Sequence, residues 1–207
     1  MVKLIKHPLI NIKLSRMRNK NTDYRDFKSN LKQLSQFMAY ELTKNLKTKT
    51  IRIQTPLCGT NGFTFDRHVV LVPILRAGLG MVEGFAEMIP QAKTGFIGMF
   101  RNEKTLKPVE YYCKMPDCIS KSDVIIVDPM LATGNSLVAA VKLIQDQYKP
   151  HSISCACVVA APEGIKAVEK AIPKTKVFVC AIDKCLNKNG YIVPGLGDAG
   201  DRIFGTK

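Results

Sequence analysis

The sequence predicts an α/β fold built on a parallel β-sheet with helices on both faces. Two observations predict it. Between residues 69 and 182, short apolar segments that fit buried strands alternate with segments that fit helices, and polar or glycine-containing loops follow several of the strands. The length of 207 residues fits one domain with a sizeable buried core. In such sheets ligands bind beyond the carboxyl ends of the strands, so the loops there are the first candidates for a site.

The N-terminal third is predicted to hold a helix and a β-hairpin arm. Apolar side chains recur every three or four residues from Phe27 to Leu46, which predicts one amphipathic helix, and Thr22 or Asp23 is placed to cap its start. The segments 50–55 and 63–65 are expected to pair as a hairpin whose turn contains Asn61 and Gly62.

The core is predicted to begin at a continuous apolar strand. The expected strands are 69–75, 94–99, 123–127, 153–160 and 176–182, and the expected helices are 81–88, 136–148 and 163–171. We therefore expect a single domain over residues 1–207. Its helix and hairpin arm cover about 1–67, its core sheet about 68–183 and a glycine-rich C-terminal segment about 184–207.

Composition excludes several protein classes. A chain that is 46% hydrophobic and 23% charged is neither disordered nor collagen-like. The longest strongly apolar run, 69–75, is interrupted by Pro73 and is too short for a membrane span, so no membrane partner is expected. No signal-peptide pattern is visible, and the seven cysteines form no C-x-x-C motif, which predicts reduced thiols and a cytoplasmic location.

The net charge of +14 is concentrated near the N-terminus, where residues 1–50 hold twelve Lys or Arg against three Asp or Glu. A basic face of this kind can meet nucleic acid, bind a polyphosphate substrate, or simply be solvated. Lys outnumbers Arg 23 to 8, which favours the solvated face because planar bidentate recognition prefers Arg.

The loop after strand 123–127 is the strongest candidate for an anion site. It contains Gly134 and runs into a predicted helix, so free backbone N–H groups and the helix dipole would converge with the hydroxyls of Thr133 and Ser136. This predicts a phosphomonoester cradle, and not a Walker loop, because no G-x-x-x-x-G-K frame is present. Asp128 is placed to hold a ribose hydroxyl or hydrated Mg²⁺. Alternatively, Ser136 is only an N-cap and Asp128 only a turn residue.

Two arginines follow neighbouring strands of the predicted core. Arg76 comes after strand 69–75 beside Gly78, and Arg101 comes shortly after strand 94–99. A guanidinium group binds phosphate oxygens in pairs, so both are candidates for a polyphosphate ligand. Each alone also fits a surface salt bridge.

The C-terminal segment is predicted to be a backbone-rich binding loop. Residues 195–200 match G-x-G-x-x-G, but too few residues follow for the helix and second strand of a dinucleotide site. Gly78 and Gly80 after a strand are a weaker oxidoreductase candidate, because the third glycine is displaced to Gly84. A glycine-rich loop presents N–H and C=O groups that suit a planar base with alternating donors and acceptors.

These motifs together resemble the uracil phosphoribosyltransferases of the type I phosphoribosyltransferase family. The resemblance runs from about Lys6 to the last residue, and its C-terminal motif is the most specific. The matching segments are PILRAGLGM (73–81), VIIVDPMLATG (124–134), AAPEG (160–164), YIVPGLGDAGD (191–201) and FGT (204–206).

The resemblance implies a type I phosphoribosyltransferase-like parallel sheet with flanking helices, a β-hairpin arm and a base-binding C-terminal hood at about 184–207. It implies transfer of the phosphoribosyl group from 5-phospho-α-D-ribose 1-diphosphate (PRPP) to uracil, giving UMP and diphosphate. Mg²⁺ is expected through PRPP and water, without a direct protein ligand. A homo-oligomer and a GTP effector are also implied, and nucleic acid is not expected as a partner.

Carried over position by position, the resemblance implies roles for individual residues. The implied catalytic residues are Arg76, Arg101, Asp128 and Asp198. The implied PRPP-binding residues are Arg76, Arg101, Asp128, Pro129, Met130, Leu131, Ala132, Thr133, Gly134, Asn135, Ser136 and Asp198. The implied uracil-binding residues are Ile192, Gly197, Asp198 and Ala199.

Two loop positions depart from common patterns. Pro129 stands where many phosphoribosyltransferases carry a second acid, so two carboxylates cannot hold the ribose diol together. Asn135 stands where the family usually has Gly, and if that position needs a positive φ, Asn is the least costly other choice. One alternative function stays open: a regulator with this fold that binds RNA through its basic N-terminal quarter, although aromatic residues are sparse there.

Overall fold

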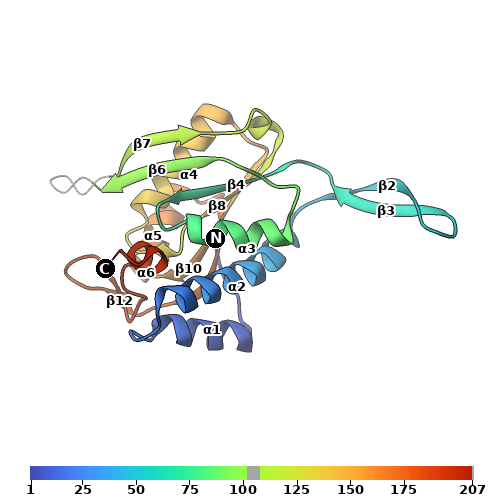
Figure 1. Ribbon diagram of the computed structural model, residues 1–207. Coiled ribbons are helices and arrows are strands. Elements are labelled where there is room, and N and C mark those ends of the chain that lie inside the picture. The colour runs from blue at the N-terminus through green and yellow to red at the C-terminus, as the bar shows by residue number, and fades with distance from the viewer. Residues whose placement is uncertain (102–107, 207) are drawn as a thin grey trace.

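A mainly parallel sheet runs through the molecule in the computed structural model (Figure 1). The structure describes residues 1–101 and 108–206, and of Arg101 and Pro108 it describes only the backbone. Its order is β1-β11-β10-β8-β4-β6-β7, with β5 beside β4 and β9 beside β10. Only the β6–β7 pair is antiparallel among these pairings. The strands are β1 (Val2–Leu4), β4 (Val69–Leu75), β5 (Lys93–Thr94), β6 (Phe96–Arg101), β7 (Pro108–Lys114), β8 (Asp123–Val127), β9 (Met130–Leu131), β10 (Ser152–Ala160) and β11 (Lys176–Ile182).

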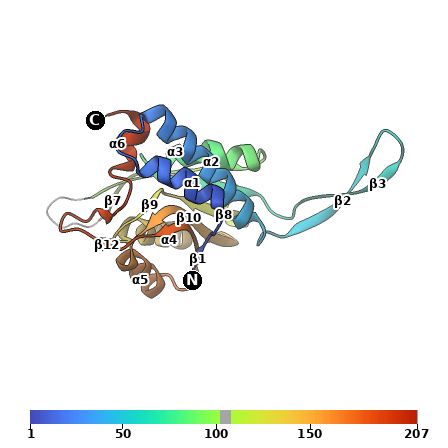
Figure 2. The same ribbon diagram turned by 90° about the horizontal axis from the view of Figure 1, so that it is seen from below.

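Helices cover both faces of this sheet, which confirms the predicted fold class. One face packs against α1 (Pro8–Arg18), α2 (Tyr24–Thr43), α3 (Leu79–Met88) and the short α6 (Ala199–Phe204). The other face packs against α4 (Asn135–Tyr148) and α5 (Pro162–Ala171). Figures 1 and 2 show α1, α2 and α3 on one side of the strands and α4 and α5 on the other. A 3₁₀ turn, Ile119–Lys121, precedes β8.

The N-terminal region holds two helices where the sequence predicted one. Asp23, one of the two residues predicted as the cap, caps α2 by accepting the Asp26 N–H at 2.8 Å. The additional helix α1 begins at Pro8, and His7 caps it by accepting the Leu9 N–H at 3.1 Å. This helix was not predicted because its apolar pattern is short: only the side chains of Ile10, Leu14 and Met17 are buried.

The β-hairpin arm consists of β2 (Thr48–Gln54) and β3 (Gly59–Phe65) and extends away from the sheet (Figures 1 and 2). The prediction that Asn61 and Gly62 form its turn is wrong, because both residues pair with β2 inside the ladder. The turn is at residues 55–58. There the Thr55 hydroxyl accepts the Leu57 and Cys58 N–H groups at 3.2 and 3.0 Å, which stabilises the reversal without a glycine.

The C-terminal segment adds elements outside the central sheet. It contains the short antiparallel pair β12 (Cys185–Leu186) and β13 (Ile192–Val193), followed by α6. Across residues 1–101 and 108–206, the structure contains no helix with the length and apolar character needed to span a bilayer.

Candidate active site

A cavity of about 310 Å³ lies beyond the carboxyl ends of β4 and β8. Ala77 lines it from the loop after β4, and Asp128, Met130 and Ala132 line it from the loop after β8. The C-terminal segment forms the opposite wall with Asn189, Gly190, Tyr191, Ile192, Gly197, Asp198, Ala199 and Gly200. The structure therefore brings the predicted phosphate loop and the predicted base-binding residues to one cavity.

The loop after β8 is held in place by a bond to β10 and by the Asp128 side chain. The Asp128 N–H donates to the Ala156 carbonyl at 3.1 Å, and the Asp128 carboxylate accepts the Met130 N–H at 3.2 Å. Burial raises the pKa of Asp128 to about 7, because desolvation disfavours the charged carboxylate. Pro129 and Leu131 are buried, and their carbonyls accept N–H groups of Val158, Val159 and Ala161, so they shape the loop.

The start of α4 has the features of an anion site. Its N-cap is Gly134, which has no side chain that could accept a first-turn N–H. The N–H groups of the first turn, which begins at Asn135 and Ser136, therefore point toward the loop end with the positive end of the helix dipole. Thr133 is partly exposed, and its hydroxyl lies 3.5 Å from the Asn135 N–H.

The suggestion that Asn135 replaces a glycine with positive φ is wrong. The positive φ of this loop, +81°, belongs to Gly134, and Asn135 is the first residue of α4 with a right-handed backbone. A Cβ atom at Gly134 would also lie 2.9 Å from the Gly164 carbonyl oxygen. Position 134 therefore requires glycine, and position 135 does not.

We expect Gly134→Val to lower the free energy of unfolding by about 1–3 kcal/mol, because valine at positive φ is strained and its Cβ meets backbone. Asn135→Val should change it by less than about 0.5 kcal/mol, because this exposed side chain lies on a regular helix start. Urea denaturation of the two neighbouring variants measures both. Equal losses would contradict the assignment of the strained position.

The loop after β4 reaches the C-terminal segment through an ion pair. The Arg76 guanidinium lies 3.3 Å from the Asp201 carboxylate and remains 60% exposed. The Thr206 hydroxyl donates to the same carboxylate oxygen at 2.5 Å. Arg101 ends β6, and its side chain lies outside the described residues.

Two partly buried arginines fix the C-terminal segment to α1 and the residue after it. Arg18 forms two hydrogen bonds with the buried Asp183 carboxylate, at 2.5 and 2.9 Å, and Asp183 also accepts the Gly195 N–H at 2.9 Å. Arg202 donates to the Leu196 carbonyl at 3.0 Å and to the Asn19 carbonyl at 2.7 Å. These contacts hold the backbone on both sides of Gly197.

The residues that could face a base are backbone groups of this fixed segment. Gly197 has φ +73°, and Asp198 caps α6 by accepting the Asp201 N–H at 3.0 Å. The described residues supply no hydrogen-bond partner to the Gly197 carbonyl or the Ala199 N–H. Both residues line the cavity, which leaves an acceptor and a donor available there.

The sequence reasoning missed several residues of this site. Tyr191 and Gly200 lie inside the C-terminal motif, so the motif itself could have included them. Asn189 precedes Gly190 in a turn signal. Asp201 also ends that motif, but its pairing with Arg76 had no usable signal. The Arg18–Asp183 pair had none either, because in both pairs the partners lie far apart in sequence.

The sheet, the loop and the C-terminal hood define the phosphoribosyltransferase class of α/β proteins. The fold is shared with the adenine phosphoribosyl transferase of Trypanosoma brucei, at a TM-score of 0.61 and 11% identity, covering 91% of this chain and 87% of that one. The family model described as uracil phosphoribosyltransferase matches residues 4–206.

More similar proteins narrow the class. A uracil phosphoribosyltransferase of Ureaplasma parvum serovar 3 is 55% identical over 208 residues, which covers 100% of both chains. The solved structure of the AQ2163 protein from Aquifex aeolicus superimposes with a TM-score of 0.94 at 37% identity, over 99% of this chain and 98% of that one. The chain belongs to the uracil phosphoribosyltransferase family, and the resemblance inferred from its motifs is confirmed.

Proposed function

We propose that this chain transfers the phosphoribosyl group of PRPP to uracil, with UMP and diphosphate as products. Family membership supports the reaction. The observation that carries the proposal is the single cavity between the Asp128 loop and the hood. One wall suits a sugar phosphate and the other suits a planar base, so both substrates would meet there.

The sugar phosphate would lie along the wall lined by Asp128, Met130 and Ala132, with its 5′-phosphate at the start of α4. The 5′-phosphate would accept hydrogen bonds from the first-turn N–H groups of α4 and from the Thr133 and Ser136 hydroxyls. The Asp128 carboxylate would accept a ribose hydroxyl at the strand end. Ala132 and Met130 line the cavity beside it.

The base would be read by the backbone of the hood. The Gly197 carbonyl would accept the uracil N3–H, and the Ala199 N–H would donate to the uracil C4 carbonyl. Ile192 and Tyr191 would border the ring from the β13 side. Because the hood is fixed by Arg18 and Arg202, the base would be held in line with the reacting sugar carbon.

In the reaction, the bond from the sugar C1 to diphosphate breaks and a bond from C1 to uracil N1 forms. The N1 proton leaves to water or to the departing diphosphate. Arg76 would stabilise the charge that develops on the leaving diphosphate, and Arg101 is assigned the same role by the resemblance. The positively charged sugar of the transition state would be shielded from water by the hood.

Mg²⁺ fits this site as a companion of the substrate. Asp128 and Asp198 both line the cavity and offer carboxylate oxygens, the ligands that Mg²⁺ prefers. Among the described residues there is no group of three or more His, Cys, Asp or Glu that could hold a metal ion alone. We expect Asp128 and Asp198 to hold the ion through water, where it would neutralise charge on the diphosphate.

Incubation of the protein with labelled uracil, PRPP and Mg²⁺ tests the proposal. We expect labelled UMP to form in proportion to enzyme and time, and none to form when PRPP is replaced by ribose 5-phosphate. Uracil left unchanged with PRPP present would contradict the proposed function.

PRPP binding should strengthen by about tenfold between pH 6 and pH 8. With the pKa of Asp128 raised to about 7, about a tenth of this carboxyl is ionised at pH 6 and about nine-tenths at pH 8. The ionised form accepts the ribose hydroxyls, so affinity rises as the proton leaves. Titration calorimetry with PRPP across this range measures the effect, and Asp128→Asn should flatten it. A profile that is equally steep in the variant would assign the change to PRPP itself.

Other expectations stay predictions. We expect a cytoplasmic homo-oligomer and a GTP effector from the family resemblance. No feature of the described residues favours the RNA-binding regulator.

A further inference from the structure

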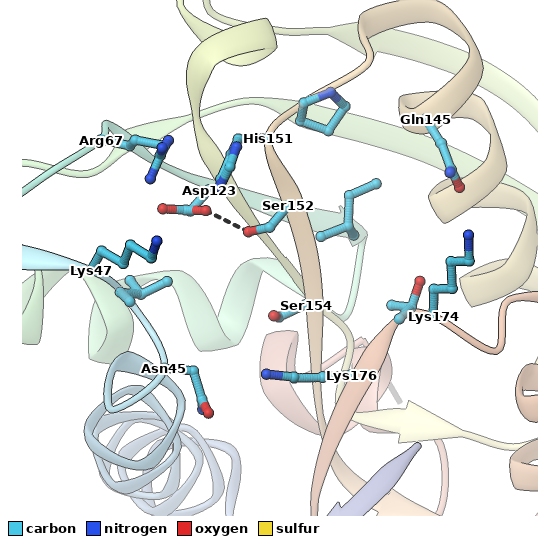
Figure 3. Close-up of a pocket in the computed structure, with 14 residues that line it drawn as sticks. Asn45, Lys47, Arg67, Asp123, Gln145, His151, Ser152, Ser154, Lys174 and Lys176 are labelled. Atoms are coloured by element: carbon cyan, nitrogen blue, oxygen red, sulfur yellow. Dashed lines mark hydrogen bonds between the residues drawn. The ribbon is translucent and has the colours of Figure 1, made fainter.

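A second cavity, of about 380 Å³, lies at the end of the sheet opposite the candidate active site. The first residues of three parallel strands line it: Asp123 of β8, Ser152 of β10 and Lys176 of β11. The active-site loops instead follow the last residues of β4 and β8. This amino-end cavity, drawn in Figure 3, is therefore separate from the site described above.

Four basic side chains from three segments line the amino-end cavity. Lys47 comes from the connection after α2, Arg67 from the connection before β4, and Lys174 and Lys176 from the approach to β11 and its first residue. His151 lines the same cavity. Figure 3 shows Lys47, Arg67 and His151 around the start of β8 and β10, Lys176 below them beside Ser154, and Lys174 with Gln145 across β10.

The protein's own carboxylates do not balance these charges. Asp123 is the single carboxylate among the lining residues, it is buried, and it already accepts the Ser152 hydroxyl at 2.5 Å. Arg67 pairs with Asp66 at 3.0 Å. Within the described part of the chain, no carboxylate lies within ion-pair distance of Lys47, Lys174 or Lys176.

Uncompensated cations in a concave surface raise the local positive potential and concentrate anions. Lysine ammonium groups and arginine forks both bind phosphate oxygens. The hydroxyls of Ser152 and Ser154 and the amide of Asn45 add donors or acceptors between the cations. Because the cations are spread around the cavity, an anion whose charge is spread over linked phosphates would contact more of them than a single phosphate.

We propose that the amino-end cavity binds an oligophosphate group. Apart from His151, the lining contains no aromatic ring on which a nucleobase could stack. The group would therefore be recognised through its phosphates, whether it is free tripolyphosphate or the phosphate chain of a nucleotide, and with little preference for the base. The same lack of stacking residues disfavours single-stranded RNA. This proposal does not depend on the reaction at the other end of the sheet.

Titration calorimetry of the full chain with inorganic tripolyphosphate at physiological salt tests the proposal. The Lys47→Gln/Lys176→Gln double variant should bind at least about tenfold more weakly than wild type at this site, because two phosphate-binding charges are lost. Its melting temperature and its turnover of uracil should be unchanged, since both lysines are exposed and remote from the active site. The Arg76→Ala variant should retain this binding event, which separates it from any tripolyphosphate bound at the active site.

A matched control removes the same number of positive charges outside the cavity. Lys166→Gln/Lys170→Gln changes two exposed lysines of α5 that do not line the cavity, and should leave tripolyphosphate affinity within about twofold of wild type.

ATP and GTP should bind the amino-end cavity within about threefold of tripolyphosphate. Equal weakening in both double variants would overturn the proposal. So would a preference above about tenfold for one base, or for a single-stranded oligonucleotide.

Discussion

Replacing Arg76 with alanine should lower kcat/KM for PRPP by about 10²–10³-fold, which corresponds to about 2.7–4 kcal/mol of transition-state stabilisation. Arg76 follows β4 at the edge of the cavity, next to the cavity-lining Ala77, and pairs with Asp201 of the hood. Its guanidinium would meet the diphosphate where negative charge grows as the bond to the sugar breaks. Uracil binding should change little, because the base is assigned to backbone groups of the hood.

Steady-state kinetics with PRPP as the varied substrate, together with equilibrium dialysis of uracil, measure the two effects. Arg52→Ala, on the exposed hairpin arm, is a control that removes the same side chain at a distance from the cavity. Asp201→Asn should have a smaller effect than Arg76→Ala, because it removes the ion pair that orients Arg76 but keeps the guanidinium. An Arg76→Ala enzyme within about twofold of wild type would remove Arg76 from the mechanism.

Most of the central sheet could be predicted because its strands are buried on both faces. The strands β4, β8 and β11 have the bounds that were predicted, since each is a continuous apolar run that no amphipathic helix would contain. The edge strands β1 and β7 were not predicted. β1 has three residues, and β7 alternates less clearly, with exposed Tyr111 and Tyr112.

The place of the candidate site in the sheet could be predicted, but the contacts that hold its walls could not. Parallel strands place Arg76 and Asp128 at one sheet edge, so the loops after β4 and β8 were found from the pattern. The hydrogen bonds of Arg18 with Asp183 and of Arg202 with Leu196 and Asn19 depend on how the termini meet. Local spacing carries no information about such pairs, and the conformation of Gly134 likewise became clear only from its dihedral angle.

The largest expected effect concerns the choice of base: wild-type enzyme should favour uracil over cytosine by about 10³-fold in kcat/KM. Cytosine has no proton on N3 and carries an amino group at C4, so it would face the Gly197 carbonyl and the Ala199 N–H with its donors and acceptors inverted. Each buried polar group left unpaired costs about 1–3 kcal/mol, and two such groups reach about this ratio. Competition kinetics with both bases measure it.

Gly197→Val tests whether the backbone reads the base. Gly197 has φ +73°, and a Cβ there would meet only the Arg202 Cδ at 3.7 Å, so valine would act by shifting the strained backbone and not by a clash. We expect uracil turnover to fall by about tenfold or more and the preference over cytosine to shrink, because the Gly197 carbonyl moves away from N3–H. Gly205→Val is the matched control: Gly205 also has a positive φ, +65°, but does not line the cavity. Equal losses in both variants would indicate general destabilisation of α6, and comparable turnover of the two bases by wild type would contradict backbone recognition of uracil.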